Sequence, residues 1–249
     1  MKFRVIPSIL TNGNTVVKGT NFDNWRTVGN AQATAMLYAS RNPDELMFLD
    51  VTATEQSRVI DPRLIQHFSN VLNVPFSVGG GIKSLKDVRI CLRAGAERVV
   101  LGTRAITNST LVTEIANEFG SQAVMVAIDI LSKDYPKITS NSGKKMHEID
   151  PVSFAKRMAS FGAGELLIQT KSNDGMMGGL FTDIISTIVE EVDIPVILSS
   201  GAGCLNDFVN AYKLGVSGVA AGAFFQFTQF TPEEVRNFLE KNQVPVRRV

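Results

Sequence analysis

The sequence predicts an α/β fold, a single (β/α)8 TIM barrel with a two-fold half-barrel repeat. Residues 79–103 overlay residues 199–223 at a constant offset of 120, and glycines 81, 95 and 102 meet glycines 201, 215 and 222. Two similar halves of this kind bury their apolar faces against each other. The 249 residues also match the usual size of such a barrel. We therefore expect one domain over residues 1–249, with half-barrels at about 1–120 and 121–249.

Eight short apolar runs predict strands, and the amphipathic stretches between them predict helices. The expected strands cover residues 4–10, 46–51, 75–78, 98–101, 124–129, 165–169, 195–199 and 217–220. The expected helices cover residues 31–40, 62–72, 85–94, 110–119, 151–161, 183–191, 205–213 and 232–241. Ser84 and Asn206 stand where helix N-caps are needed. This alternation is typical of parallel strands, and the repeat favours a closed barrel over an open, doubly wound sheet.

Composition narrows the class of partner. The net charge is +1 and the 20% of charged residues are dispersed, so neither nucleic acid nor a membrane surface is expected as a partner. No apolar run reaches the length of a membrane span and no signal-peptide pattern opens the chain, which predicts a cytoplasmic protein. Cys91 and Cys204 lack metal or disulfide spacing and are expected to be reduced core residues. A small molecule or another protein is therefore the expected partner.

Four predicted strands end in glycine-rich turns. These are VGGGI at 78–82, LGTR at 101–104, SGAG at 200–203 and AGA at 221–223. In such barrels the chemistry sits at the carboxyl ends of the strands. Glycine turns and the helix N-termini after them direct backbone N–H groups at anions. We therefore expect two phosphate sites on opposite sides of the barrel mouth, although the glycines could instead only relieve crowding in tight turns.

Three aspartates follow predicted strands. Asp50, Asp129 and Asp174 are each placed to face the barrel mouth and exchange a proton with a bound substrate. Asp129 is the best candidate for a general acid or base. Asp50 has a structural alternative, in which it accepts N–H groups of its own loop, and Asp174 could simply begin a turn before Gly175.

The histidines and the residues around Ser142 do not predict a specific site. His67 and His147 have no partner at metal-ligand spacing, so we expect no metal site. We also expect no cofactor, because no nicotinamide fingerprint follows the first strand. Ser142, with Lys144 and Lys145 after it, could meet a negative charge or form a solvated hairpin.

Several motifs resemble the cyclase subunit of imidazole glycerol phosphate synthase. The resemblance covers essentially the whole chain and is carried by VVKGTNF, DELMFLDVTA, PFSVGGGI, FGSQAVMVAID, NSGKK, GAGELLIQ and SGAG. That family is a (β/α)8 barrel that takes ammonia from a glutaminase docked at the N-terminal face of its barrel. The ammonia passes through the barrel to a bis-phosphorylated ribonucleotide, which the family cyclises to imidazole glycerol phosphate and an aminoimidazole carboxamide ribotide.

The resemblance also implies roles for residues at both ends of the barrel. At the mouth, Asp129 matches the second catalytic aspartate of the family, and the substrate-binding residues are Lys18, Asp50 and Ser142. The phosphate half-sites map to Gly81, Gly102 and Thr103 on one side and to Asp174, Gly175, Gly201, Gly203 and Gly222 on the other. At the floor, the ammonia gate maps to Arg4, Glu45, Arg98 and Glu165, and Glu97 falls at a position that couples to the glutaminase. This charged ring could instead be an ordinary plug of a barrel floor.

The departures from the family pattern concern the chemistry. The first strand of the family ends in a catalytic aspartate, and here Leu10 stands at that position. Loss of one member of an acid–base pair costs about 10²–10⁴ in rate. In addition, Gly102, Gly222 and Met176 replace side chains that donate hydrogen bonds to the phosphates in the family.

These departures favour a different acceptor for the same ammonia. Relatives without the first aspartate work with a glutaminase and a further amidotransferase to convert an acetamido sugar to an acetamidino sugar for surface polysaccharide. The resemblance therefore favours sugar amidation, with a glutaminase and a phosphorylated small molecule as partners. A genuine histidine-pathway cyclase and a non-catalytic scaffold that activates a glutaminase remain the alternatives.

Overall fold

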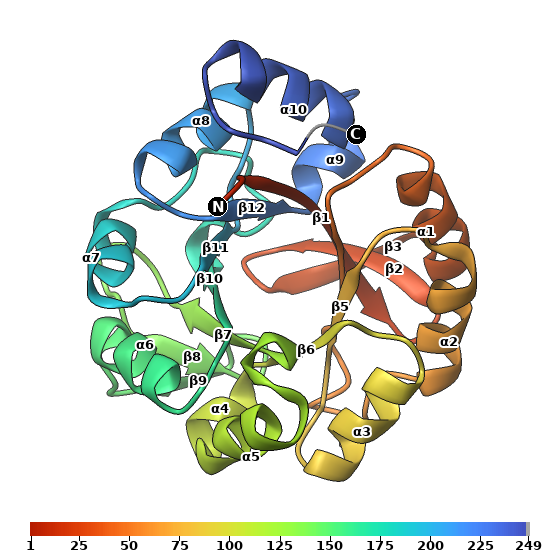
Figure 1. Cartoon of the computed structure of the whole chain (residues 1–249), viewed down its shortest axis with the longest axis vertical. Coiled ribbons are helices and arrows are strands. Elements are labelled where there is room, and N and C mark those ends of the chain that lie inside the picture. The colour runs from red at the N-terminus through yellow and green to blue at the C-terminus, as the bar shows by residue number, and fades with distance from the viewer. Residues whose placement is uncertain (248–249) are drawn as a thin grey trace.

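Eight parallel strands close into a barrel in the computed structural model, which describes residues 1–247 (Figure 1). They follow one another around the barrel as β1 (Arg4–Asn12), β4 (Leu46–Asp50), β5 (Phe76–Gly79), β6 (Arg98–Leu101), β7 (Val124–Ile130), β10 (Glu165–Thr170), β11 (Val196–Ser199) and β12 (Gly218–Ala221). The pairing of β12 with β1 closes the ring. The (β/α)8 barrel predicted from the sequence is confirmed.

The longer helices lie around the outside of the barrel strands (Figure 1). They are α1 (Ala31–Ala39), α2 (Pro62–Val71), α3 (Leu85–Arg93), α5 (Thr110–Phe119), α6 (Pro151–Ser160), α7 (Asp183–Glu191), α8 (Leu205–Lys213) and α10 (Pro232–Lys241). The helix starts follow local chemistry. Asp61, Asp150 and Thr231 cap the backbone N–H groups of α2, α6 and α10, and proline follows each cap.

The two halves repeat element by element. Helix α3 begins at Leu85 and α8 at Leu205, and the short helices α4 (Thr103–Thr107) and α9 (Ala223–Phe227) are likewise 120 residues apart. The cap at Ser84 is confirmed, because its hydroxyl accepts the N–H of Asp87. The expected cap at Asn206 is wrong: Cys204 is the N-cap of α8, and the carboxylate of Asp207 accepts its backbone N–H.

The two cysteines lie in different surroundings. Cys91 is buried in α3, as expected, and burial raises its pKa to about 12. Cys204 is exposed, so its assignment to the core is wrong, because it caps a helix at the barrel mouth instead of facing the strands. Both are free thiols.

Two hairpins sit on the barrel mouth; the sequence did not predict the first, and the second was one of the two alternatives considered for Ser142. The first joins β2 (Thr15–Thr20) to β3 (Asp23–Asn30) in the connection between β1 and α1. The second joins β8 (Ile138–Ser140) to β9 (Lys145–His147) after β7. The remaining elements are two short 3-10 helices, η1 (Ser121–Ala123) and η2 (Lys171–Asn173). The hairpins extend strands of the barrel and so build up the mouth around the candidate site.

The core has two parts. The larger part lies between strands and helices, where Phe48 and Phe68 stack with ring centroids 3.9 Å apart. The smaller part is a separate cluster of buried side chains that come from seven of the eight barrel strands. Its members are Ile6, Met47, Val100, Met125, Ala127, Leu167, Ile197 and Ala220. No helix within residues 1–247 is both long and apolar enough to cross a membrane.

Candidate active site

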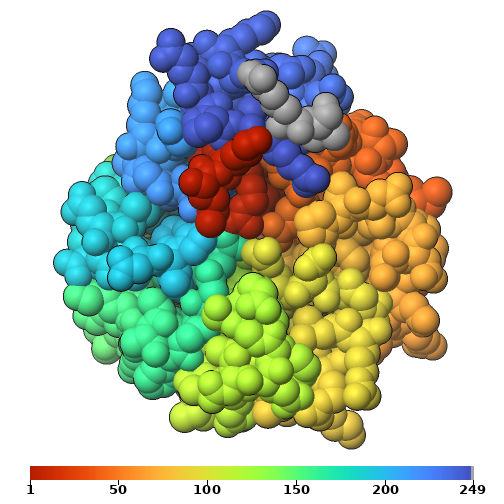
Figure 2. Space-filling view, in the orientation of Figure 1, coloured from red at the N-terminus to blue at the C-terminus, as the bar shows by residue number. Residues whose placement is uncertain are grey.

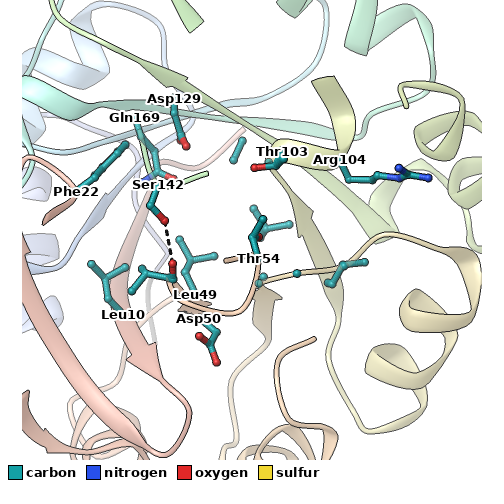
Figure 3. Close-up of a pocket in the computed structure, with 18 of the residues that line it drawn as sticks. Leu10, Phe22, Leu49, Asp50, Thr54, Thr103, Arg104, Asp129, Ser142 and Gln169 are labelled. Carbon is teal, nitrogen blue, oxygen red and sulfur yellow. Dashed lines mark hydrogen bonds between the residues drawn. The ribbon is translucent and has the colours of Figure 1, made fainter. Parts of the chain in front are cut away.

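A cavity of about 340 Å³ opens at the carboxyl ends of the strands. Its lining includes Leu10 of β1, Asp50 of β4, Gly79 of β5, Asp129 of β7 and Gln169 of β10 (Figure 3). Strand ends that are far apart in the sequence thus meet in one pocket. Its size falls in the usual range of small-molecule sites.

Asp129 is the titratable group of this cavity whose pKa lies nearest to neutrality. Burial raises the pKa of its carboxyl to about 7, and the negative charge of Asp174 adds to the rise. A group with this pKa is present in both protonation states near neutral pH, which is what general acid–base catalysis requires. Asp129 therefore remains the candidate general acid or base of this cavity.

Leu10 lines the same cavity. It pairs with Leu49 of β4 in the parallel register, one residue before the pair of Thr11 with Asp50. An apolar side chain thus stands near the end of β1, at the position where the resemblance implies a catalytic aspartate. Leu10 cannot take up or release a proton.

Asp50 is committed to an ion pair. Its two oxygens lie 2.5 and 3.0 Å from the two terminal nitrogens of Arg58, and it also accepts the N–H groups of Thr52 and Gly13. Its carboxylate points away from Asp129 (Figure 3). Asp50 therefore lines the cavity as the structural carboxylate that holds its own loop, which was the alternative considered from the sequence.

Lys18 is buried on the opposite side of the mouth. Its ammonium donates to the carbonyl of Ser8 at 3.2 Å and lies beside Gly222, 2.5 Å from where a β-carbon of that residue would be. Burial lowers the pKa of Lys18 to about 8, partly offset by the charge of Asp174. Lys18 also lines a cavity at the second expected half-site, together with Gly175 and Gly222, and the volume of that cavity is only about 30 Å³.

The glycines of the expected half-sites fall into two groups. A β-carbon at Gly81 would collide with the carbonyl of Arg58, and one at Gly203 with the carbonyl of Met177. Gly175 and Gly201 are crowded in the same way, so close packing alone requires these glycines. The N–H of Gly203 is also taken by Asp207 at 2.8 Å. Gly102 has nothing within 4 Å of a β-carbon and leaves open space next to Thr103.

The β8–β9 hairpin connects two loops of the mouth. The Ser142 hydroxyl donates to the carbonyl of Val51 at 2.8 Å, and the Asn141 N–H donates to the hydroxyl of Thr103 at 3.0 Å. Lys144 pairs with Glu55 at 2.7 Å. Ser142 thus lines the cavity and also fastens the hairpin, and Lys144 forms an exposed ion pair.

The four residues expected at the floor form one network. Glu165 accepts bonds from both Arg4 and Arg98, and Glu45 pairs with Arg4 at 3.1 Å. Glu45 also accepts the Ser77 hydroxyl at 2.7 Å. These groups line a separate cavity of about 430 Å³ at the face where the strands begin. The first residues of the chain, red in Figure 2, lie on that face.

Glu97 precedes β6 at the same end of the barrel and is exposed. Its backbone N–H donates to the carbonyl of Phe76. Its side chain is therefore available to a partner. Within residues 1–247, no group of three or more His, Cys, Asp or Glu side chains could hold a metal ion.

Comparison of the sequence with known proteins identifies the family of this chain. A family model described as histidine biosynthesis protein matches residues 4–231. Three relatives, all named imidazole glycerol phosphate synthase subunit HisF, are similar over nearly their full length. The relative from Thermococcus onnurineus is 36% identical over 98% of this chain and 97% of its own. The chain belongs to the HisF family.

Two further HisF relatives give the same result. The protein from Cytophaga hutchinsonii is 35% identical over 98% of both chains, and that from Dictyoglomus thermophilum is 37% identical over 98% of both chains. The family expected from the motifs is thereby confirmed. These matches do not separate a sugar-amidation branch from the HisF proteins themselves.

Proposed function

We propose that this chain is the ammonia-using subunit of a HisF-type glutamine amidotransferase complex. The relatives carry the name of the HisF subunit of imidazole glycerol phosphate synthase along nearly their whole length. Ammonia enters at the floor from a glutaminase partner, and Asp129 transfers the protons of the reaction at the mouth. We place this function in the cytoplasm, where free thiols such as those of Cys91 and Cys204 persist.

The route for ammonia runs between the two ends of the barrel. The floor network of Arg4, Glu45, Arg98 and Glu165 guards the entrance, and the interior layer of apolar side chains follows it. A neutral ammonia molecule crosses an apolar layer at far lower cost than an ammonium ion. The exposed Glu97 is placed to meet the glutaminase on the same face.

Cyclisation of the bis-phosphorylated ribonucleotide of histidine synthesis is the first candidate reaction. It is supported by the names and the coverage of the HisF relatives. Asp129, with its pKa of about 7, is the single proton-transfer group in this proposal. Because Leu10 supplies no second group, we expect this reaction to run about 10²–10⁴ times more slowly than with an acid–base pair.

Amidation of a sugar is the second candidate, and one observation favours it. Leu10 replaces the proton-transfer group that cyclisation uses while the charged floor is retained. A chain that keeps its ammonia entrance and lacks half of its acid–base pair suits delivery of ammonia to another acceptor. An acetamido sugar that becomes an acetamidino sugar is that acceptor in this candidate.

A scaffold role makes a different prediction for Asp129. A subunit that only activates a glutaminase needs its floor and not its mouth. We expect Asp129→Asn to abolish ammonia-dependent turnover of the assembled complex, with the glutaminase rate unchanged. Unchanged amidation by the variant complex would leave the scaffold role as the explanation.

The test of the proposal is turnover of the ribonucleotide by the purified chain with excess ammonium salt, so that no partner is needed. The HisF protein from Cytophaga hutchinsonii, assayed beside it, is the reference. Slow but Asp129-dependent turnover supports the first candidate. No turnover by the folded chain, together with glutamine-dependent amidation of a nucleotide-linked acetamido sugar, supports the second.

A further inference from the structure

Strand β10 lines the barrel from its floor to its mouth with alternate side chains. Successive side chains of a strand point to opposite faces, so residues 165, 167 and 169 share the inward face of β10. Glu165 belongs to the floor network, Leu167 to the interior layer of apolar side chains, and Gln169 lines the cavity at the mouth. Gln169 is therefore the first polar side chain that this face of β10 carries on the mouth side of the apolar layer.

The neighbouring strand β7 has the same order of side chains. Met125 and Ala127 belong to the interior apolar layer, and Asp129, two residues further along the strand, lines the cavity. Asp129 and Gln169 are partners in the parallel register of β7 and β10. The two side chains therefore lie side by side at the mouth, as Figure 3 shows.

Gln169 lies at the boundary between the two cavities of the mouth. It lines both the cavity of about 340 Å³ and the cavity of about 30 Å³, and so do Leu10 and Asp174. Leu10 has no polar group. Burial raises the pKa of Asp174 to about 6, and the ammonium of Lys18 opposes this rise. Gln169 thus adds a neutral polar group at this boundary, next to the acid–base candidate Asp129.

The carboxamide of Gln169 is free to bind a small molecule. It forms no hydrogen bond within residues 1–247. By contrast, the hydroxyls of Ser142 and Thr103, which line the same cavity, hold the β8–β9 hairpin. A carboxamide oxygen accepts hydrogen bonds, and its NH2 group donates them. The oxygen can therefore accept an N–H of neutral ammonia and leave the nitrogen lone pair unbonded.

We propose that Gln169 binds the ammonia substrate where the apolar interior opens into the mouth, with its carboxamide oxygen accepting an N–H of ammonia beside Asp129. Ammonia reacts through its lone pair, which a hydrogen bond from its N–H leaves directed away from Gln169. The side chain thus holds and orients ammonia without transferring a proton. Passage of ammonia through the barrel is part of the proposed function, on which this role of Gln169 rests.

Nuclear magnetic resonance of the full chain with isotope-labelled glutamine tests this contact directly. The side-chain NH2 resonance that is absent from Gln169→Met belongs to Gln169. We expect ammonium salt at alkaline pH, where neutral ammonia is present, to shift this resonance until it saturates. The resonance of Gln66, exposed on α2, should not shift. Sodium chloride at equal ionic strength should shift neither resonance.

Kinetics test the same contact during turnover. Gln169→Met keeps the length of the side chain and removes its polar groups. The KM for ammonia should rise about threefold to tenfold, the effect of one hydrogen bond, while the KM for the ribonucleotide stays within about twofold. Gln66→Met makes the same change on the exposed face of α2 and should alter neither KM. If Gln169→Met lowers the folded fraction by circular dichroism, Gln169→Asn, which withdraws the oxygen by one methylene, replaces it in both measurements.

Three results would overturn this role of Gln169. They are a Gln169 resonance that ammonia does not shift, an equal shift of the Gln66 resonance, or an unchanged KM for ammonia in an active Gln169→Met chain. The resonance measurement needs no acceptor and no turnover. A chain that turns over no ribonucleotide can still show the shift, and an active chain can lack it, so the proposed function and the role of Gln169 fail separately.

Discussion

The two terminal nitrogens of Arg58 contact the two carboxylate oxygens of Asp50, at 2.5 and 3.0 Å, beneath the barrel mouth. The pair joins the end of β4 to the loop that precedes α2. Because Asp50 is 4% exposed and its oxygens are engaged, it does not replace the proton-transfer group missing at Leu10. Asp129 and Asp174 are the other two carboxylates that line the cavity. Burial raises the pKa of Asp174 to about 6, an effect that the charge of Lys18 opposes, and the pKa of Asp129 is higher, at about 7.

Asp50→Asn should lower the free energy of unfolding. The variant loses charge-assisted bonds to Arg58 at a buried position, at a cost of about 1.5–3 kcal/mol. Glu118→Gln removes a carboxylate from the more exposed pair with Arg89 and should cost less than about 1 kcal/mol. Urea unfolding at neutral pH compares the two. Equal losses would show that Asp50 is not held as the structure describes.

Leu10→Asp should raise turnover of the bis-phosphorylated ribonucleotide with ammonium salt. The new carboxylate faces the cavity of Asp129 and restores a second proton-transfer group, which is worth about 10²–10⁴ in rate when well placed. Leu10→Asn has a similar shape without a titratable group and is the control. An increase of at least about tenfold for aspartate alone is expected. Equal rates for the two variants would remove Leu10 from the account of the chemistry.

Asp129 should make stability depend on pH in a defined direction. Its pKa is about 7 in the folded chain and 3.8 ordinarily, so the folded state keeps a proton that the unfolded state has lost between these values. The free energy of unfolding contributed by this group is therefore full below about pH 4 and falls as the pH rises to about 7. The free energy of unfolding of Asp129→Asn, measured by urea unfolding, should therefore rise relative to that of the wild type by about 4 kcal/mol between pH 4 and pH 8. A constant difference across this range would contradict the raised pKa.

Glu165→Gln should lower turnover with glutamine as the source of ammonia and leave turnover with ammonium salt nearly unchanged. Glu165 joins Arg4 to Arg98 in the floor network, so its loss disturbs the entrance and leaves the mouth intact. Turnover with glutamine and the partner should fall at least about tenfold, while turnover with ammonium salt stays within about twofold. Glu190→Gln, at an exposed position of α7, is the control. Equal losses with both ammonia sources would count against a gate at the floor.

The barrel could be predicted from the sequence because its signals are local and repeated. The expected strand at 98–101 and helix at 205–213 agree with β6 and α8. The β2–β3 hairpin was missed, because its residues 23–30 are mostly exposed and show no apolar alternation. The turn at Asn12 and Gly13 and the apolar Val16 and Val17 were the available signals.

The candidate site was predictable in its residues and less so in their contacts. Motifs placed Asp129 and Lys18 at the mouth, where the structure has them. The pair of Arg58 with Asp50 and the enclosure of Lys18 beside Gly222 depend on how loops fold over the barrel. These contacts are tertiary contacts between separate loops. They leave no periodic pattern of apolar and polar residues in the sequence, so they could not be predicted from it.

The most direct test of the account is the rate at which the wild-type chain turns over the bis-phosphorylated ribonucleotide with saturating ammonium salt, measured beside the Cytophaga hutchinsonii HisF protein. A single proton-transfer group at Asp129 predicts a rate about 10²–10⁴ times lower than that of the relative, lost in Asp129→Asn and raised in Leu10→Asp. A wild-type rate equal to that of the relative would contradict the account, because Leu10 would then have no effect on the chemistry.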